Sequence, residues 1–235
     1  SKLLLEQIKI SNSVSSFYNS YGNKIQKLSV KSSSFSNFLD TIFIMDSAPI
    51  QYFGEKFENE VRIDTDTDFK SCFFVNSSIV TMGRDYYFSI DSCYFYGKIN
   101  SQYLISDAKN VNFTRCTFDN VGYIGMNDMT MEYSVFNGYS VYGDIPLKIK
   151  DSLNLFYTNF TNSNCYLAIH SYSFHLNNVI FTNNQIKCLL KQDSSGIIAN
   201  SLFYDNEFNY FHACSNELEE LELTISNSCI FVDKF

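Results

Sequence analysis

A column of bulky apolar residues, nearly all of them Phe, recurs along this 235-residue chain, with most gaps between 18 and 27 residues. A repeat of about 20 to 50 residues is typical of solenoids, in which each unit buries its apolar side chains by stacking on its neighbours. We call these positions column residues. The sequence predicts them at Phe17, Phe35, Phe74, Phe95, Phe118, Phe136, Phe160, Phe181, Phe203 and Ile230.

Side chains at fixed offsets before each column residue predict one short strand per coil. Five and seven residues earlier the chain is mostly apolar, as at Ile90 and Phe88 before Phe95. A period of two is that of a β-strand, so both positions are expected inside. Two residues before the column the side chain is small, as at Cys93, which we interpret as selection for size more than for polarity. The first coil is the exception, because Asn12 stands five residues before its column residue.

Turn-forming residues follow the column. Two residues after it, nine of ten positions hold Asn, Asp or Gly, which tolerate left-handed backbone conformations. These positions are Asn19, Asn37, Asn76, Gly97, Asn120, Gly138, Asn162, Asn183, Asp205 and Val232. The pattern predicts one bend made alike in every coil, with side-chain amides that hydrogen-bond from coil to coil.

The gap of 39 residues between Phe35 and Phe74 is about two periods. Phe57 fits within it as the column residue of an eleventh, degenerate coil, whose small interior slot would hold Glu55. An unpaired carboxylate is costly to bury, so the backbone must bulge there if this coil exists. We therefore expect one β-helix domain over residues 1–235, with an irregular coil or insertion at 45–68.

In coil length, in its aromatic and aliphatic columns and in its Asn column at a turn, the chain from about Ile8 to Phe231 resembles the right-handed parallel β-helices of the pectate-lyase-like superfamily. The resemblance implies an all-β fold, a right-handed parallel β-helix of about 10–11 coils. Ankyrin, tetratricopeptide and HEAT arrays require a 3.6-residue pattern, which the sequence lacks.

Charge and hydropathy restrict the partners. A net charge of -8 and a pI near 4.8 disfavour nucleic acid and anionic membranes, which bind basic surfaces. No apolar run reaches the length of a membrane span, so we expect no membrane insertion by this segment. The chain lacks an initiating Met and the coil pattern runs almost to both ends, so we expect a segment of a larger protein. Flanking domains or other chains would then cover its open ends.

Seven cysteines invite a disulfide or metal interpretation. They are Cys72, Cys93, Cys116, Cys165, Cys188, Cys214 and Cys229. The first three share the small interior slot of successive coils, so we expect them to stack as buried apolar residues. No CxxC motif or Cys/His pair at metal-ligand spacing occurs. A disulfide remains the alternative for at least one pair.

Asp64, Asp66 and Asp68 are the candidate metal ligands. Strand alternation would aim the three carboxylates at one face, where oxygen ligands can gather calcium. Neighbouring carboxylates also shift one another's pKa, as acid/base hydrolysis requires. A solvated acidic strand explains the same residues without a ligand, and we favour it.

Other polar residues carry a weaker signal. Four of them fall at outward positions near one wall of consecutive coils: Asp91, Arg115, Asp119 and Glu132. Superfamily lyases use Asp and Arg on an exposed sheet, but their paired-Asp and Arg-containing signatures are absent here. We therefore assign no catalytic or cofactor-binding residue, and interpret the four as cross-coil ion pairs. The three histidines, His170, His175 and His212, are isolated and are interpreted as surface or turn residues.

Exposed tyrosines are also expected. The candidates are Tyr94, Tyr96, Tyr157 and Tyr204. Such rings can stack on sugars, although strand propensity alone explains a Tyr-rich chain, and we favour that explanation.

The sequence therefore predicts a non-catalytic structural or interaction domain of a larger surface or assembly protein. Its flat sheet faces would bind other protein chains, and an extracellular or cell-surface location is favoured. Enzymatic activity is not expected. A polysaccharide lyase or hydrolase is the alternative, as is a glycan-binding adhesin domain, with glycan as partner and calcium as the only cofactor considered.

Overall fold

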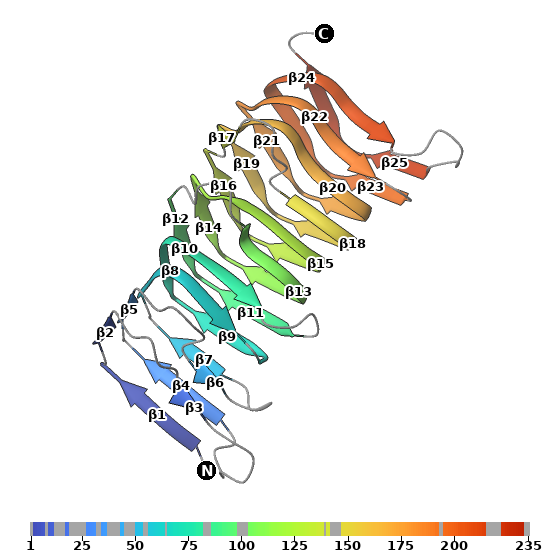
Figure 1. The fold of residues 1–235 in the computed structure, drawn as a ribbon. Helices are drawn as coiled ribbons and strands as arrows, with labels where there is room; N and C mark the ends of the chain where they lie inside the picture. The colour runs from blue at the N-terminus through green and yellow to red at the C-terminus, as the bar shows by residue number, and fades with distance from the viewer. Residues whose placement is uncertain are drawn as a thin grey trace.

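The computed structural model describes most of the chain. Its described residues are 2–7, 9–11, 17–18, 27–31, 34–36, 43–44, 50–53, 56–63, 65–81, 86–97, 103–138, 140–141, 147–192, 195–214 and 222–232. They form an all-β, parallel solenoid, in which coils stack from the N-terminus at one end to the C-terminus at the other (Figure 1). Three ladders of parallel strands run along this stack.

The first ladder contains the strands five to seven residues before the column. Its members are β1 (Lys2–Glu6), β4 (Lys27–Lys31), β7 (Ile50–Phe53), β9 (Thr67–Lys70), β11 (Tyr87–Asp91), the ends of β13 (Tyr103–Thr114), β15 (Tyr123–Glu132), β18 (Leu147–Phe156) and β20 (Asn164–Asn177), then β23 (Ser195–Ala199) and β25 (Glu222–Ser226).

The second ladder carries the column residues. Its members are β2 (Lys9–Ser11), β5 (Ser34–Ser36), the starts of β8 (Lys56–Ile63) and β10 (Phe73–Thr81), β12 (Tyr94–Tyr96), β14 (Thr117–Asp119), β16 (Val135–Asn137), β19 (Asn159–Thr161), β21 (Ile180–Thr182), the start of β24 (Leu202–Cys214) and β26 (Cys229–Val232).

The third ladder uses the remaining parts of the long strands. It runs through the ends of β8 and β10, the starts of β13, β15, β18 and β20, then β22 (Gln185–Gln192) and the end of β24. The short strand β17 (Ser140–Val141) pairs with β20. Two further strands, β3 (Phe17–Tyr18) and β6 (Phe43–Ile44), form a separate parallel pair.

The column of phenylalanines is confirmed as a continuous interior stack. From Phe74 to Phe203 each ring stacks on the next, with centroids 4.4–5.2 Å apart and interplanar angles of 4–10°. These distances match the spacing of about 4.8 Å between neighbouring strands. Phe113 meets the column edge-on, 5.1 Å from Phe118. The rings therefore form one core that continues from coil to coil.

The register links eleven positions of the described chain into this column: Ile10, Phe35, Phe57, Phe74, Phe95, Phe118, Phe136, Phe160, Phe181, Phe203 and Ile230. Phe57 is thus a column residue, as its spacing predicts. Strands β7, β8 and the start of β9 occupy ladder positions within residues 45–68, while Glu55 lies outside the described residues.

The prediction for Phe17 was wrong. Its strand pairs with Phe43 in the separate sheet, and Ile10 takes the first column position. The physical reason is the strand β1, where Leu5 pairs with Val30 of the next coil and supplies the apolar residue five before the column. Asn12, the polar residue that the predicted register placed inside, lies outside the described residues.

The predicted interior positions of the first ladder are buried in most coils; Phe88, Ile90, Met129 and Leu155 are examples. Ile225 departs from this pattern with 44% of its surface exposed. It belongs to β25, and no described coil packs beyond it.

The bend after the column is confirmed where β12 to β24 pass into the third ladder. Backbone φ is positive at Gly97, Asn120, Gly138, Asn162, Asn183 and Asp205. At Gly138 an added Cβ would lie 2.9 Å from Oδ1 of Asn120, so a larger residue there would have to displace that side chain. At Asn76 the prediction of a tight turn was wrong, since β10 runs through it and only shifts register between Val75 and Ser77.

A second bend, three residues before the column, was not predicted. Backbone φ is positive at Gln7, Ser71, Ser92, Arg115, Tyr133, Tyr157, Asn178, Asn200 and Asn227. We call this row the first corner, because it separates the first ladder from the second. From Ser71 to Asn200, the backbone N–H at each of these positions donates to a carbonyl of the following coil, as Arg115 does to Glu132 at 2.9 Å.

Candidate functional site

Asp66 and Asp68 are both exposed and alternate with the buried Thr65 and Thr67, so their carboxylates share an outer face. Oδ1 of Asp66 accepts a hydrogen bond from the backbone N–H of Tyr87, 3.0 Å away. Asp64 lies outside the described residues. Among the residues that are described, no group of three or more His, Cys, Asp or Glu is placed to hold a metal ion. Calcium binding by the three aspartates stays a prediction.

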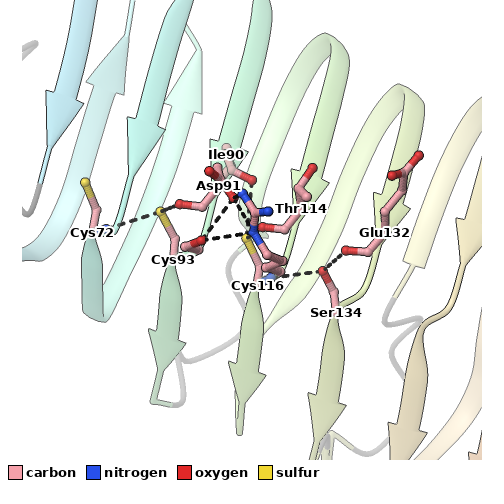
Figure 2. A network of polar contacts seen from close by, with 10 residues as sticks. Cys72, Ile90, Asp91, Cys93, Thr114, Cys116, Glu132 and Ser134 are labelled. Carbon is pink, nitrogen blue, oxygen red and sulfur yellow. Dashed lines mark hydrogen bonds and ion pairs between the residues drawn. The ribbon is translucent and has the colours of Figure 1, made fainter.

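Asp91 and Arg115 form a cross-coil ion pair at the first corner. The guanidinium donates twice to Oδ1 of Asp91, from Nη2 at 2.5 Å and from Nε at 3.0 Å, while Ser92 donates to the same oxygen at 3.0 Å (Figure 2). The partial burial of Asp91 acts to raise its pKa. The hydrogen bonds from Arg115 and Ser92 and the charges of Arg115 and Lys70 outweigh that effect, so the pKa of Asp91 lies below 3.8. A carboxyl group held ionised in this way is a poor general acid near neutral pH.

Replacing Arg115 with Gln is expected to raise the pKa of Asp91 toward 3.8. Because the folded pKa is depressed, the stabilisation from this carboxylate is present above the unfolded pKa and is lost as pH falls through the folded pKa. Titrating the Asp91 carboxyl by NMR measures the change, and Lys70→Gln is a control with a smaller effect. An unchanged Asp91 pKa in the Arg115 variant would contradict the ion pair. The loss of stability should stay below about 1 kcal/mol, because the Arg115 side chain is largely exposed to solvent.

The four residues expected on one wall do not all meet. Asp119 lies on the outer face of the second ladder, where it accepts hydrogen bonds from Tyr94 at 3.1 Å and from Asn120 and Asn137 at 3.1 and 3.2 Å. Desolvation, the hydrogen bond to Asp119 and the charge of Asp119 raise the pKa of Tyr94 above 10. This carboxylate is tied to three neighbours in a cross-coil network.

Glu132 belongs to the same row of the first ladder as Asp91, with Thr114 between them in register. Its carboxylate points away from the Asp91–Arg115 pair (Figure 2). Of the four residues interpreted as cross-coil ion pairs, Asp91 and Arg115 do form one, and Asp119 and Glu132 take no part in it.

The histidines are dispersed. His175 lies on the first ladder, beside Asn154, and its ring meets Phe156 edge-on at 5.4 Å. His170 lies on the third ladder opposite Lys148 and Lys191. The backbone at His212 pairs with Leu190, and its side chain lies outside the described set.

Side chains in the small slot, two residues before the column, also form hydrogen bonds with the backbone. In Cys93, Ser134, Thr158 and Ser201 the side chain donates to the carbonyl two residues earlier, at 2.8–3.4 Å. Several of these atoms also accept an N–H from the preceding coil, as when Cys116 N donates to Ser134 Oγ at 3.0 Å (Figure 2). The interpretation that size is selected more than polarity therefore needs an addition: in these coils the polar hydrogen also satisfies the corner backbone, although Val179 fills the same slot without one.

Cys72, Cys93 and Cys116 stack in this slot as the sequence predicts. They are buried free thiols, and Cys72 N donates to Cys93 Sγ at 3.3 Å. Hydrogen bonds with Cys116 and Cys72, together with burial, raise the pKa of the Cys93 thiol. Burial also raises the pKa of Cys165 to about 12. The hydrogen bond with Cys93 instead lowers the pKa of Cys116. Cys93 and Cys165 are therefore structural, since thiolate rather than thiol is the reactive form.

In the native protein, Cys229 is expected to react with iodoacetamide far faster than the buried thiols, because it is exposed and they are not. The protected set is Cys72, Cys93, Cys116, Cys165 and Cys188. Peptide mapping by mass spectrometry should show protection of about 100-fold or more, lost in denaturant. Equal native labelling of Cys93 and Cys229 would contradict the stacked slot.

A buried amide ladder was not predicted. Asn184 and Asn206 are each 1% exposed, three residues after the column. Nδ2 of Asn184 donates to Phe160 O at 3.1 Å and to Asn206 Oδ1 at 2.9 Å, while its Oδ1 accepts the N–H of Ser163 at 2.9 Å. The predicted outer amide contacts also occur, with Asn183 donating to Asn162 and Asn162 to Asn137. The signal available in the sequence was the Asn-Asn pair at residues 183 and 184, which follows the column directly.

Exposed aromatic rings gather at two places. On the outer face of the second ladder, Phe73 and Tyr96 are exposed and flank Tyr94, with ring centroids 6.5 and 6.4 Å from it. At the first corner, the rings of Tyr133 and Tyr157 stack with centroids 4.9 Å apart. Tyr204 is exposed on another coil of the second ladder. Tyr96, Tyr157 and Tyr204 are exposed as the sequence predicts, whereas Tyr94 is half-buried, and the sequence did not identify Phe73 or Tyr133.

Comparison with known proteins adds no relative. No protein-family model, curated protein or solved structure matches this chain. The parallel solenoid is therefore established by its own strand pairing and not by kinship. Within the part of the chain that the structure describes, no helix is both long and apolar enough to cross a bilayer.

Proposed function

We propose that this chain is a non-catalytic structural or interaction domain of a larger surface or assembly protein, and that its sheet faces bind other protein chains. The observation that carries the proposal is the engagement of its outward carboxylates. Asp91, Asp119 and Asp128 each accept hydrogen bonds from residues of a neighbouring coil. Carboxylates engaged in this way hold coils together and are not free to act as a general acid or base.

The outer face of the first ladder supplies the contact surface. One row in register across consecutive coils contains Asp68, Ser89, Asn112, Thr130, Asn154, His175, Ile197 and Thr224. Most of these side chains are short and polar, and the row spans many coils. Such a surface suits a broad contact with hydrogen bonds more than a concave small-molecule site. The acidic chain favours a neutral or basic partner.

Binding to a partner identified by cross-linking and then purified tests the proposal. Asn112→Arg combined with Asn154→Arg should weaken that complex at least about tenfold, because two bulky charges enter the row. Tyr172→Arg places the same charge on an exposed site of β20 outside the row and should leave the complex intact. Loss of binding in the control alone, or a chain that forms no complex at all, would reject the proposed surface.

A polysaccharide lyase or hydrolase is the alternative proposal, supported by the exposed pair Asp66 and Asp68. Turnover of uronate or neutral glycans, measured with calcium and with chelator, would favour it. That turnover must fall when Asp64, Asp66 and Asp68 are all changed to Asn. The right hand of the coil and membership of the pectate-lyase-like superfamily belong to this proposal as well, and rest on the coil length and columns.

A further inference from the structure

In the coils where the structure describes it, the first corner has the same backbone conformation but holds different residues. In three later coils the residue is Asn178, Asn200 or Asn227, with φ between 47° and 56°. Asn suits left-handed backbone, because its short side chain bonds locally. Tyr133 and Tyr157 hold φ of 51° in the same position. A bulky residue with a Cβ costs about 1–2 kcal/mol there, so these two tyrosines oppose the local backbone preference.

Burial in the core does not offset this backbone free-energy cost for either ring. Tyr133 and Tyr157 are 57% and 51% exposed. Their mutual stacking is nearly parallel, at 4° and 4.9 Å, and such a pair contributes about 0.5–1.5 kcal/mol beyond its buried area. Exposed residues kept in an unfavourable backbone conformation are concentrated at binding sites.

The first-corner row passes from tyrosine to asparagine directly after Tyr157. The N–H of Tyr157 donates to Asn177 O in the next coil, where the corner residue is Asn178. Nδ2 of Asn178 donates to Asn177 Oδ1 at 3.0 Å, and Nδ2 of Asn200 donates to the same oxygen at 2.9 Å. Tyr157 and Asn178 thus hold successive positions of the first corner, one coil apart, and the row continues from Asn178 to Asn200. We call Tyr133, Tyr157, Asn178 and Asn200 the tyrosine step.

We propose that the tyrosine step binds a neutral hexose unit of a glycan chain. A pyranose ring has an apolar face that packs on an aromatic ring, and hydroxyl groups that need donors and acceptors at its edge. Tyr157 supplies a ring fixed from behind by Tyr133. Each amide uses one N–H in the row, and an amide group has a second N–H and a carbonyl oxygen. The step contains no charged side chain, and the net charge of -8 disfavours polyanionic uronates.

This inference is independent of protein binding by the first-ladder face. The tyrosine step lies at the corner, outside the row that contains Asn112 and Asn154, so variants of one surface leave the other unchanged. Either proposal can therefore fail without the other.

Titration calorimetry with neutral hexaoses of glucose, mannose and galactose tests the step, using the whole chain. At least one hexaose should bind, and Tyr157→Asn should raise its Kd about tenfold or more. Asn occupies this corner in three other coils, so Tyr157→Asn and Tyr133→Asn should fold, with urea midpoints equal to or above that of the parent protein. Tyr157→Phe, which keeps the ring, should change Kd less than about threefold. Asn178→Gly removes an amide and keeps the backbone, and should also weaken binding.

Tyr172→Asn is the matched control, because Tyr172 is 53% exposed on β20 and lies outside the corner. It should bind the hexaose like the parent protein. The proposal is overturned if no neutral hexaose binds at millimolar concentration, if Tyr157→Asn binds as tightly as the parent, or if the control loses affinity equally. Binding of oligogalacturonate without binding of any neutral hexaose would also overturn it.

Discussion

Phe118→Ala is expected to lower the free energy of unfolding by about 3–5 kcal/mol, the cost of truncating a fully buried Phe. Phe118 is 0% exposed and lies between the rings of Phe95 and Phe136, at 4.9 and 4.4 Å. Removing it leaves a cavity and separates two stacked neighbours, and rigid strands on either side limit collapse. Urea denaturation followed by circular dichroism measures the loss.

The position of the damage is also predicted. In a solenoid each coil contacts only its neighbours, so amide hydrogen exchange should accelerate most in β12, β14 and β16. Tyr172→Ala, at an exposed ring, should change stability by less than about 0.5 kcal/mol. A Phe118 variant as stable as this control would show that the column is not the core.

Asn184→Leu should destabilise the protein by about 2–5 kcal/mol, although leucine is apolar and similar in volume. The change removes the partners of the Ser163 N–H and the Phe160 carbonyl, which are buried in the coil interior. Each buried polar group left without a partner costs about 1–3 kcal/mol. The same urea experiment measures the effect.

Asn183→Gly is the matched control for this change. Asn183 is exposed, has a φ of 54° and donates to Asn162. Glycine keeps that backbone conformation, so only an exposed hydrogen bond is lost, and the cost should stay below about 1 kcal/mol. Equal destabilisation by both variants would show that the buried amide ladder contributes no more to stability than the exposed hydrogen bond of Asn183.

The columns could be predicted because interior residues of a solenoid repeat in kind. Phe95, Phe118 and Phe181 fill equivalent places, so size and spacing alone identify them. The prediction for the first coil failed because its apolar alternation begins at Leu3 and Leu5, in the strand that pairs with β4. Phe17 is a residue of the expected type at a plausible distance, but its strand forms another sheet. Residue type and spacing in the sequence did not distinguish these two registers. The strand pairing in the structure does.

The first corner was invisible for a different reason. Left-handed backbone is recognised in a sequence by Gly and Asn, and Tyr133, Tyr157 and Arg115 belong to neither group. The interior amides Asn184 and Asn206 were missed because polar residues are expected outside, and burial of an amide becomes favourable only when the partners from two other coils are in place. The ion pair between Asp91 and Arg115 was within reach, since the two residues lie 24 apart, about one coil.

The equivalence of the corners affects how the length of such a chain can evolve. From β11 to β24, successive coils pass through the same two bends and present the same column, so in this part of the chain one unit is a near substitute for another. Duplicating or excising a stretch of one period would restore every rung without redesigning the interior. Gene segments of that size could thus lengthen or shorten the rod in whole steps, while novelty accumulates in the outward residues of single coils.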